Sequence, residues 1–194
     1  MARNVGSLTA RLCMIETSNL LAAKTYVGID NGTSGAIAAL DPSDRFVLLE
    51  PVRTENLGKR LILDIKGNRE ILADVARQAG GSQHVVVAYE KPPMNPKWSF
   101  ASGLAIGRDA EFWRVLLTIE CIPFIQVHAL TWQTGLLKAF RMSLPGKADP
   151  KAAARLYLAQ RFPKVSLDGK YNATQCKGLR DAMCLACWAR SAKQ

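Results

Sequence analysis

The chain has 194 residues, 48% of them hydrophobic, which is enough for one well-buried domain and too few for two large ones. Its 26 Lys and Arg exceed its 16 Asp and Glu, and the resulting net charge of +10 favours a polyanionic partner. We expect no membrane partner and a reducing, cytoplasmic compartment, because no hydrophobic run reaches the roughly 20 residues of a membrane span and the five cysteines lack the spacing of a secreted disulfide framework.

The first half of the chain is expected to supply most of a β-sheet. Residues 1–24 are predicted to be a flexible N-terminal extension, with an organelle-targeting segment as the alternative, and residues 25–194 a single domain. Runs at 25–29, 35–40 and 46–52 predict an antiparallel meander of three strands. Helical spacing over residues 71–79 predicts a helix ended by Gly80 and Gly81. The apolar run 84–89 is typical of a strand buried on both faces, and its position after a helix favours parallel pairing.

The second half is expected to be mainly helical. Helices are predicted at 101–119 and 129–139, with a short strand at 124–127 between them. Asp149 followed by Pro150 is typical of a helix start and predicts a helix over 150–161, and the last helix is expected from about 179 to 190. This order of elements predicts an α/β sandwich built on a mixed sheet.

Several residues that could suggest chemistry are expected to be structural instead. Cys184 and Cys187 have the spacing of half a zinc site, but they lie in an apolar helical stretch without a second ligand pair. His84 and His128 have no partner at ligand spacing, and Trp132 is expected in the core.

Three carboxylates that are far apart in the sequence stand at the ends of predicted elements. Asp30 follows the first strand, Glu90 follows strand 84–89, and Asp181 is expected to start the last helix. If the two strands are parallel neighbours, Asp30 and Glu90 emerge at one sheet edge, where the last helix could bring Asp181. Converging carboxylates repel one another unless hard cations such as Mg²⁺ or Mn²⁺ lie between them.

This pattern predicts metal-assisted phosphodiester hydrolysis. Two ions about 3.5 to 4 Å apart can clamp a phosphodiester, with Asp30 bridging both ions, Glu90 holding one and Asp181 the other. The alternative is that Glu90 and Asp181 pair with lysines or cap helices. The glycines after Asp30 are expected to let a phosphate backbone approach, the alternative being a turn in which Gly32 or Gly35 takes a positive φ.

The positive charge is concentrated in the last third of the chain. Residues 138–194 carry twelve Lys and Arg against three Asp, a net charge of +9, whereas the preceding residues amount to +1. This asymmetry predicts a surface that faces nucleic-acid phosphates, and the alternative is a solvated face that only aids solubility. The candidate phosphate contacts in this segment are Lys147, Lys151, Arg155, Lys164, Lys177 and Arg180.

Several short motifs together resemble the RuvC-type Holliday junction resolvases of the ribonuclease H-like superfamily. They are GIDNGTSG at 28–35, YEKP at 89–92, Leu104-x-x-Gly107-Arg108, the segment 127–132, and Arg180-Asp181-Ala182 through Ala186, and they cover roughly residues 25–190. The resemblance implies a ribonuclease H-like mixed five-stranded sheet flanked by helices. It also implies a homodimer, with helix 101–119 as the candidate dimer surface, that nicks four-way DNA junctions in two strands symmetrically.

The resemblance further implies a bacterial or phage-encoded protein, cytoplasmic or nucleoid-associated, that needs divalent metal and no small-molecule cofactor. Asp30, Glu90 and Asp181 fall on the family's catalytic positions. The chain departs from the pattern at Gly178, where the family usually has an acidic residue or histidine, and Asp168 or a water is a candidate replacement.

The proline-rich loop after Glu90 is the last candidate region. Family members often place an aromatic wedge three residues beyond the glutamate, where this chain has Pro93. Lys91 is a candidate DNA contact, and Trp98 or Phe100 a candidate stacking residue, with core packing as the alternative for both aromatics.

Two other function classes compete with a nuclease. GIDNGTSG also resembles the first phosphate loop of sugar kinases and actin-like ATPases, which share the fold but need a second similar domain and further nucleotide motifs. The other class is a non-catalytic junction-binding protein that lost full metal coordination at Gly178.

Overall fold

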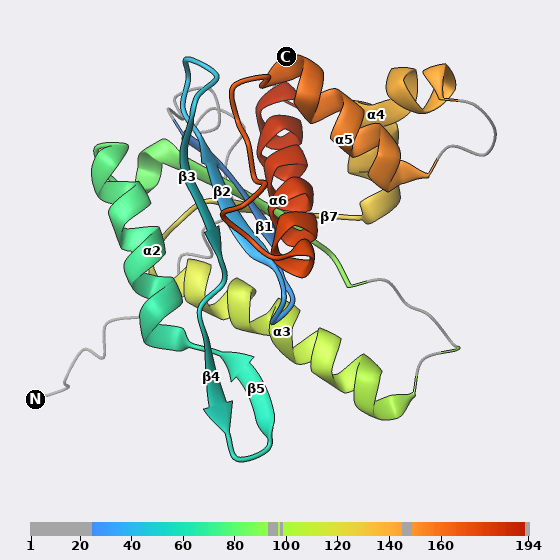
Figure 1. The fold of residues 1–194 in the computed structure, drawn as a ribbon. Helices are drawn as coiled ribbons and strands as arrows, with labels where there is room; N and C mark the ends of the chain where they lie inside the picture. The colour runs from blue at the N-terminus through green and yellow to red at the C-terminus, as the bar shows by residue number, and fades with distance from the viewer. Residues whose placement is uncertain (1–24, 93–96, 98, 145–148, 193–194) are drawn as a thin grey trace, which may run out of the picture.

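The centre of the fold is a five-stranded mixed sheet with the strand order β3-β2-β1-β6-β7 (Figure 1). The structure is a computed structural model that describes residues 25–92, 97, 99–144 and 149–192. Strands β1 (Thr25–Asp30), β2 (Ala36–Leu40) and β3 (Phe46–Pro51) form the predicted antiparallel meander. Strand β6 (Val85–Glu90) pairs parallel with β1, and β7 (Phe124–Val127) pairs parallel with β6. The predicted mixed α/β sheet is therefore confirmed.

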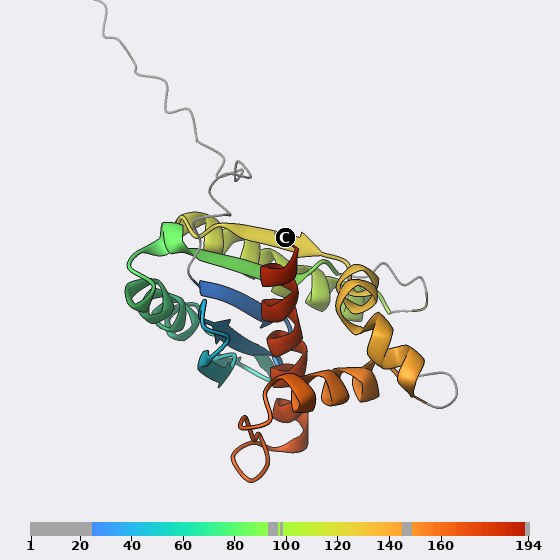
Figure 2. The same cartoon turned by 90° about the horizontal axis from the view of Figure 1, so that it is seen from above.

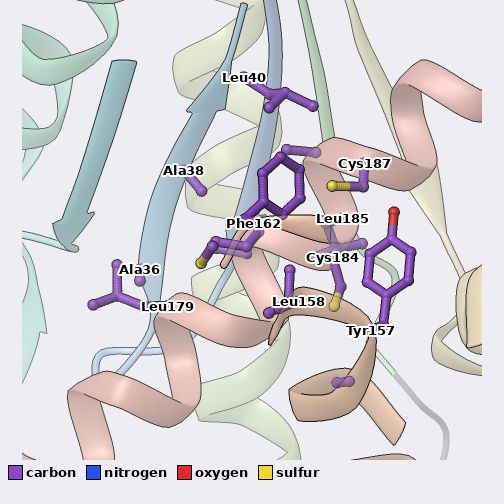
Figure 3. Packing of buried hydrophobic residues seen from close by; sticks show 14 of the residues in the cluster. Ala36, Ala38, Leu40, Tyr157, Leu158, Phe162, Leu179, Cys184, Leu185 and Cys187 are labelled. Atoms are coloured by element: carbon purple, nitrogen blue, oxygen red, sulfur yellow. The ribbon is translucent and has the colours of Figure 1, made fainter. Parts of the chain in front are cut away.

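Helices cover both faces of this sheet. Helices α2 (Ile65–Gln78) and α3 (Phe100–Ile119) pack on one face, while α4 (Ala129–Ser143), α5 (Pro150–Arg161) and α6 (Ala173–Ser191) pack on the other (Figure 2). Both faces are covered because both are apolar, as strand β2 illustrates: successive side chains of a strand point to opposite faces of the sheet. Ala36, Ala38 and Leu40 face α5 and α6, as Figure 3 shows, whereas Ile37 and Ala39 face the cluster formed with α2 and α3.

Some elements differ from the sequence prediction. A two-stranded hairpin, β4 (Thr54–Leu57) and β5 (Arg60–Leu63), precedes α2 and was not predicted, because the sequence TENL has no apolar alternation. The short 3₁₀ helix η1 (Ser82–His84) leads into β6. Helix α4 extends to Ser143, four residues past its predicted end at 139. None of the helices in the described part of the chain is both long and apolar enough to cross a membrane.

Helix α6 also begins earlier than predicted, and this corrects the position of Asp181. Its start is fixed by a capping box, in which the Asn172 side chain accepts the Gln175 backbone N–H and the Gln175 side chain accepts the Asn172 backbone N–H. Asp181 therefore lies in the middle of the helix and does not begin it. Because α6 is buried along most of its length, it forms the centre of the core on its side of the sheet.

Cys184 and Cys187 belong to this core, as predicted. Both thiols are buried in α6, among side chains of β2 and α5 (Figure 3). Burial raises the pKa of the Cys187 thiol to about 11 and that of Cys184 well above its ordinary value, so neither is a thiolate at neutral pH.

Helix α6 approaches the sheet closely because β1 carries a glycine at the contact. A Cβ placed on Gly28 would lie 1.9 Å from the Ala182 carbonyl oxygen and 2.5 Å from the Ala186 nitrogen. Any side chain at position 28 would therefore push the helix away from the strand. The glycine lets α6 lie directly on the strand that ends in Asp30.

Candidate active site

The predicted carboxylates occur at one end of the sheet. Asp30 and Glu90 are the last residues of β1 and β6, and the parallel register pairs Ile29 with Tyr89, so the two acids leave adjacent strands at the same edge. Asp181 precedes Ala182, the residue that contacts Gly28 of β1. The neighbouring strands and the close helix bring the acidic side chains of β1, β6 and α6 into one electrostatically coupled group.

The pKa values of these acids are raised because they are partly buried and close to one another. Burial, followed by the charges of Asp181 and Glu90, raises the pKa of Asp30 to about 7, against the opposing charge of Lys177. Burial and then the charge of Glu90 raise the pKa of Asp181 to about 6. Burial also raises the pKa of Glu90. Nearby positive charges do not fully offset the negative charge of these three carboxylates. Raised pKa values of this kind are typical of functional sites.

The donor type suits a hard divalent cation. Carboxylate oxygens are the ligands that Mg²⁺ and Mn²⁺ prefer, and a cation would relieve the mutual repulsion. Within the described residues, no group of three or more His, Cys, Asp or Glu side chains is arranged so that it could hold a metal ion. Among the described residues the three acids therefore form no closed three-ligand cage, and their fit to a hard cation rests on the type of their donor atoms.

Glu90 is fixed by two contacts that sequence reasoning missed. The Trp132 indole Nε1–H donates to Glu90 Oε1 at 2.7 Å, and the Asn31 Nδ2–H donates to the Glu90 carbonyl oxygen at 3.0 Å. Trp132 is only 1% exposed, so its predicted place in the core is confirmed. A buried indole N–H needs an acceptor, and this was the signal that could have linked Trp132 to a carboxylate.

Close packing explains one of the two glycines in the turn after Asp30, namely Gly35. Gly35 N–H donates to the Gly32 carbonyl at 2.8 Å, and a Cβ on Gly35 would lie 1.9 Å from the Asp30 carbonyl oxygen. Neither Gly32 nor Gly35 has a positive φ, so that alternative interpretation of the turn is wrong. A Cβ on Gly32 would meet no atom of the described residues within 4 Å, which leaves this side of the turn open.

The same turn also packs against Gly178, the position at which the related resolvases usually have a fourth ligand. A Cβ on Gly178 would lie 2.9 Å from the Ser34 carbonyl oxygen and 3.1 Å from backbone atoms of Gly35. A side chain there would require the β1–β2 turn or α6 to move, because the neighbouring atoms are backbone. The close contact between α6 and the β1–β2 turn therefore leaves no room for a ligand side chain at position 178.

A basic groove of about 500 Å³ lies beside Asp181. The structure brings four of the predicted phosphate contacts, from α5 and α6, to its wall: Lys151, Arg155, Lys177 and Arg180. Asp168, the candidate replacement for the fourth ligand, is exposed and lines the same groove. A second groove of about 410 Å³ shares Arg155, Asp168 and Arg180 and follows the α5–α6 connection.

The remaining candidates lie elsewhere or outside the described residues. Lys164 is exposed on the α5–α6 connection but lines neither groove, and Lys91 is exposed directly after Glu90. Phe100 begins α3 and is 86% exposed, so core packing is excluded for it in the isolated chain. Trp98, Lys147 and Pro93 lie outside the described residues.

The arrangement of sheet and helices defines a ribonuclease H-like α/β fold. A solved structure of Thermus thermophilus RuvC in complex with a Holliday junction substrate is similar to this chain, with a TM-score of 0.51 and 14% identity, covering 86% of this chain and 92% of that one. A further Thermus thermophilus RuvC structure gives a TM-score of 0.49 at 13% identity, covering 87% and 97%. No protein-family model matches, and no curated protein is similar in sequence. The chain therefore has a RuvC-like fold.

Proposed function

We propose that this protein is a divalent-metal-dependent endonuclease that resolves four-way DNA junctions by paired symmetric nicks. The observation that carries the proposal is the coupled carboxylate group of Asp30, Glu90 and Asp181 beside a groove walled by Lys and Arg. The similar RuvC structure was solved with a Holliday junction substrate, which supports a branched DNA as the ligand of this fold.

The carboxylates have separate roles in this proposal. Asp30 would be the ligand common to two Mg²⁺ or Mn²⁺ ions, and Glu90 and Asp181 would each complete the ligands of one ion. Bound ions would lower the pKa of an attacking water and stabilise the charge on the leaving oxygen. Asn31 and Trp132 hold Glu90 in place through its carbonyl and its carboxylate.

The basic groove positions the DNA backbone against these acids. Lys177 lies one helical turn before Asp181, and Lys151 and Arg155 line the groove from α5, so a phosphate in the groove would lie beside the Asp181 carboxylate. Such contacts are independent of sequence and dependent on salt, because they neutralise backbone phosphates. The groove therefore supplies affinity and position for the strand that is cut.

Paired nicks require two active sites, and α3 offers the surface for a second copy. An apolar depression on α3 is lined by Phe112, Val115 and Ile119 together with Ile65 of α2, and Ile65 and Ile119 are 62% and 69% exposed. Exposed apolar patches of this kind mark interaction sites. We assign this surface to a homodimer contact.

The function is tested with labelled four-way junctions and matched linear duplexes in Mg²⁺, Mn²⁺ or chelator. We expect paired nicks on junctions alone and with metal alone. Asp30→Asn should abolish nicking and preserve junction binding, because it removes the shared ligand and leaves the basic groove unchanged. Nicking by the Asp30→Asn variant would contradict the assigned site, and an absence of junction binding by the wild type would favour the ATPase alternative.

The dimer surface is tested by size in solution. Ile119→Glu should shift sedimentation from dimer to monomer and unlink the two nicks, because a buried charge opposes apolar contact. Leu130→Glu, at a 70% exposed position on α4 outside the patch, is the matched control. An unchanged dimer in the Ile119→Glu variant would exclude this face.

One observation favours a second candidate, a non-catalytic junction-binding protein. The closed position at Gly178 leaves the acids without a fourth ligand from that position of α6. Junction binding without any nicking in Mg²⁺ or Mn²⁺ would identify this second function.

A further inference from the structure

The hydrogen bond between Trp132 and Glu90 occupies one oxygen of a carboxylate in the proposed site. Trp132 Nε1–H donates to Oε1 at 2.7 Å, a short distance for an N–H bond to a carboxylate, and the indole is buried on α4. The other end of the residue is fixed as well, because Asn31 holds the Glu90 carbonyl and the Lys91 N–H donates to the Val127 carbonyl at 2.8 Å. Hydrogen bonds therefore fix both the carboxylate of Glu90 and the backbone from which its side chain extends.

The chemistry of the indole decides what this contact does. An indole nitrogen is a donor only, so it neither binds a metal ion nor titrates. It is also neutral, unlike Lys or Arg, so it leaves the charge of the carboxylate available to a cation. Its hydrogen bond takes up one lone pair of Oε1, so Oε2 is the oxygen more available to a cation.

We infer that Trp132 is a positioning residue that limits Glu90 to single-oxygen binding of a cation and thereby selects small six-coordinate ions over Ca²⁺. Mg²⁺ requires an octahedral shell and is bound by few carboxylate oxygens, whereas Ca²⁺ takes more ligands and accepts both oxygens of one carboxylate. The inference rests on the proposed metal-dependent function. It holds that the buried indole N–H of Trp132 determines which hard cation the site prefers.

Trp113 provides a matched comparison within the same chain. Its indole is also fully buried, on α3 at the opposite face of the sheet, but its Nε1 has no hydrogen-bond partner among the described residues. Replacing either tryptophan by phenylalanine removes one indole N–H and a similar volume of ring. Only the change at position 132 removes a bond to a carboxylate of the proposed site.

The test measures Mn²⁺ and Ca²⁺ binding by calorimetry for the wild type, Trp132→Phe and Trp113→Phe. We expect Trp132→Phe to weaken Mn²⁺ binding roughly 10- to 100-fold, as for other residues that orient a metal ligand, and to weaken Ca²⁺ binding less. Trp113→Phe should leave the ratio of the two affinities unchanged. An unchanged ratio in Trp132→Phe, with the wild type binding Mn²⁺, overturns the inference alone, whereas a wild type that binds no Mn²⁺ overturns the proposed function with it.

A second measurement needs no variant and decides the matter if Trp132→Phe does not fold. With ¹⁵N-labelled tryptophan in the wild type, the assigned Nε1–H resonance of Trp132 should move when Mg²⁺ is added, because its acceptor becomes a metal ligand. The Trp113 resonance should stay in place. Saturating Mg²⁺ that leaves the Trp132 resonance unmoved contradicts the inference.

Discussion

Replacing Asp30 with asparagine should stabilise the protein when metal is absent. Burial and the charges of Asp181 and Glu90 raise the pKa of Asp30 from 3.8 to about 7, so the folded state holds this proton more tightly than the unfolded chain. At about 1.4 kcal/mol per pKa unit, ionised Asp30 lowers the free energy of unfolding by at most about 4 kcal/mol at pH 8. Asparagine has nearly the same shape and no charge, so the variant does not suffer this loss of stability.

The sign of the effect depends on pH. The stability contributed by protonated Asp30 is fully present below the unfolded pKa near 3.8 and is lost as the pH rises through about 7. The wild type in chelator should therefore become less stable between pH 5 and pH 8, and Asp30→Asn should lose less. We expect the variant to be about 1 to 4 kcal/mol more stable at pH 8 and nearly equal to the wild type at pH 4.

Urea unfolding followed by tryptophan fluorescence, in chelator and in Mg²⁺, measures both effects. Mg²⁺ should stabilise the wild type, since a ligand of the folded state adds to its stability, and should stabilise Asp30→Asn much less. Asp168→Asn, at an exposed carboxylate of the neighbouring groove, is the control and should keep the pH dependence of the wild type. If Asp30→Asn is no more stable than the wild type at pH 8 in chelator, the repulsion argument is refuted.

Two further predictions concern the packing of α6 and the basic groove. Gly178→Ala should lower stability by about 1 to 3 kcal/mol in chemical unfolding, because its Cβ meets the backbone of the β1–β2 turn, whereas Gly103→Ala, whose Cβ would meet no described atom within 4 Å, should be neutral or slightly stabilising. Replacing Lys151, Arg155 and Lys164 by glutamine should weaken junction binding and reduce the salt slope by about 0.9 for each duplex phosphate that the protein no longer neutralises. Glutamine at the exposed Lys59, Arg60 and Lys66, near the β4–β5 hairpin, is the control, and an equal effect of both triple variants would mean that only net charge matters.

The sequence predicted the sheet and its acids because their signals are local. The strands are apolar runs ended by a single acid, and a strand that follows a helix pairs parallel with its neighbour in most α/β folds. These two rules were sufficient to place Asp30 and Glu90 at one edge. The prediction of α6 began too late because residues 173–178 show no apolar stripe at helical spacing, and the capping box that starts the helix was not recognised.

The unpredicted features of the site depend on contacts between distant segments. The bond from Trp132 to Glu90 joins residues 42 positions apart, and no local pattern distinguishes it from core packing. The reasons for Gly28 and Gly178 are also tertiary, since each glycine makes room for the backbone of another element. A sequence identifies such positions as glycine without showing what approaches them.

Lys177 connects the closed position at Gly178 with the charge of the site. Its ammonium opposes the raised pKa of both Asp30 and Asp181, so it supplies next to Gly178 a positive charge where a fourth acid would add a negative one. A fixed cation near the acids should weaken the binding of a mobile one. By Coulomb's law with the dielectric constant of water, a unit charge about 8 Å from a divalent ion changes its binding by about 1 kcal/mol, or roughly fivefold.

Lys177→Gln should therefore bind Mn²⁺ more tightly than the wild type at pH 8, where Asp30 is ionised, while it binds the DNA junction less tightly. Titration calorimetry for the metal and fluorescence anisotropy for the junction separate the two effects. Lys170→Gln, at an exposed position beside Tyr171, is the control for loss of one positive charge. Lys177 weakens ion binding by the free protein. Bound DNA offsets the charge of this lysine with its own phosphates, so ions should bind tightly only when the substrate is present. Mn²⁺ affinity that is unchanged or lower in Lys177→Gln would show that this lysine serves the DNA alone.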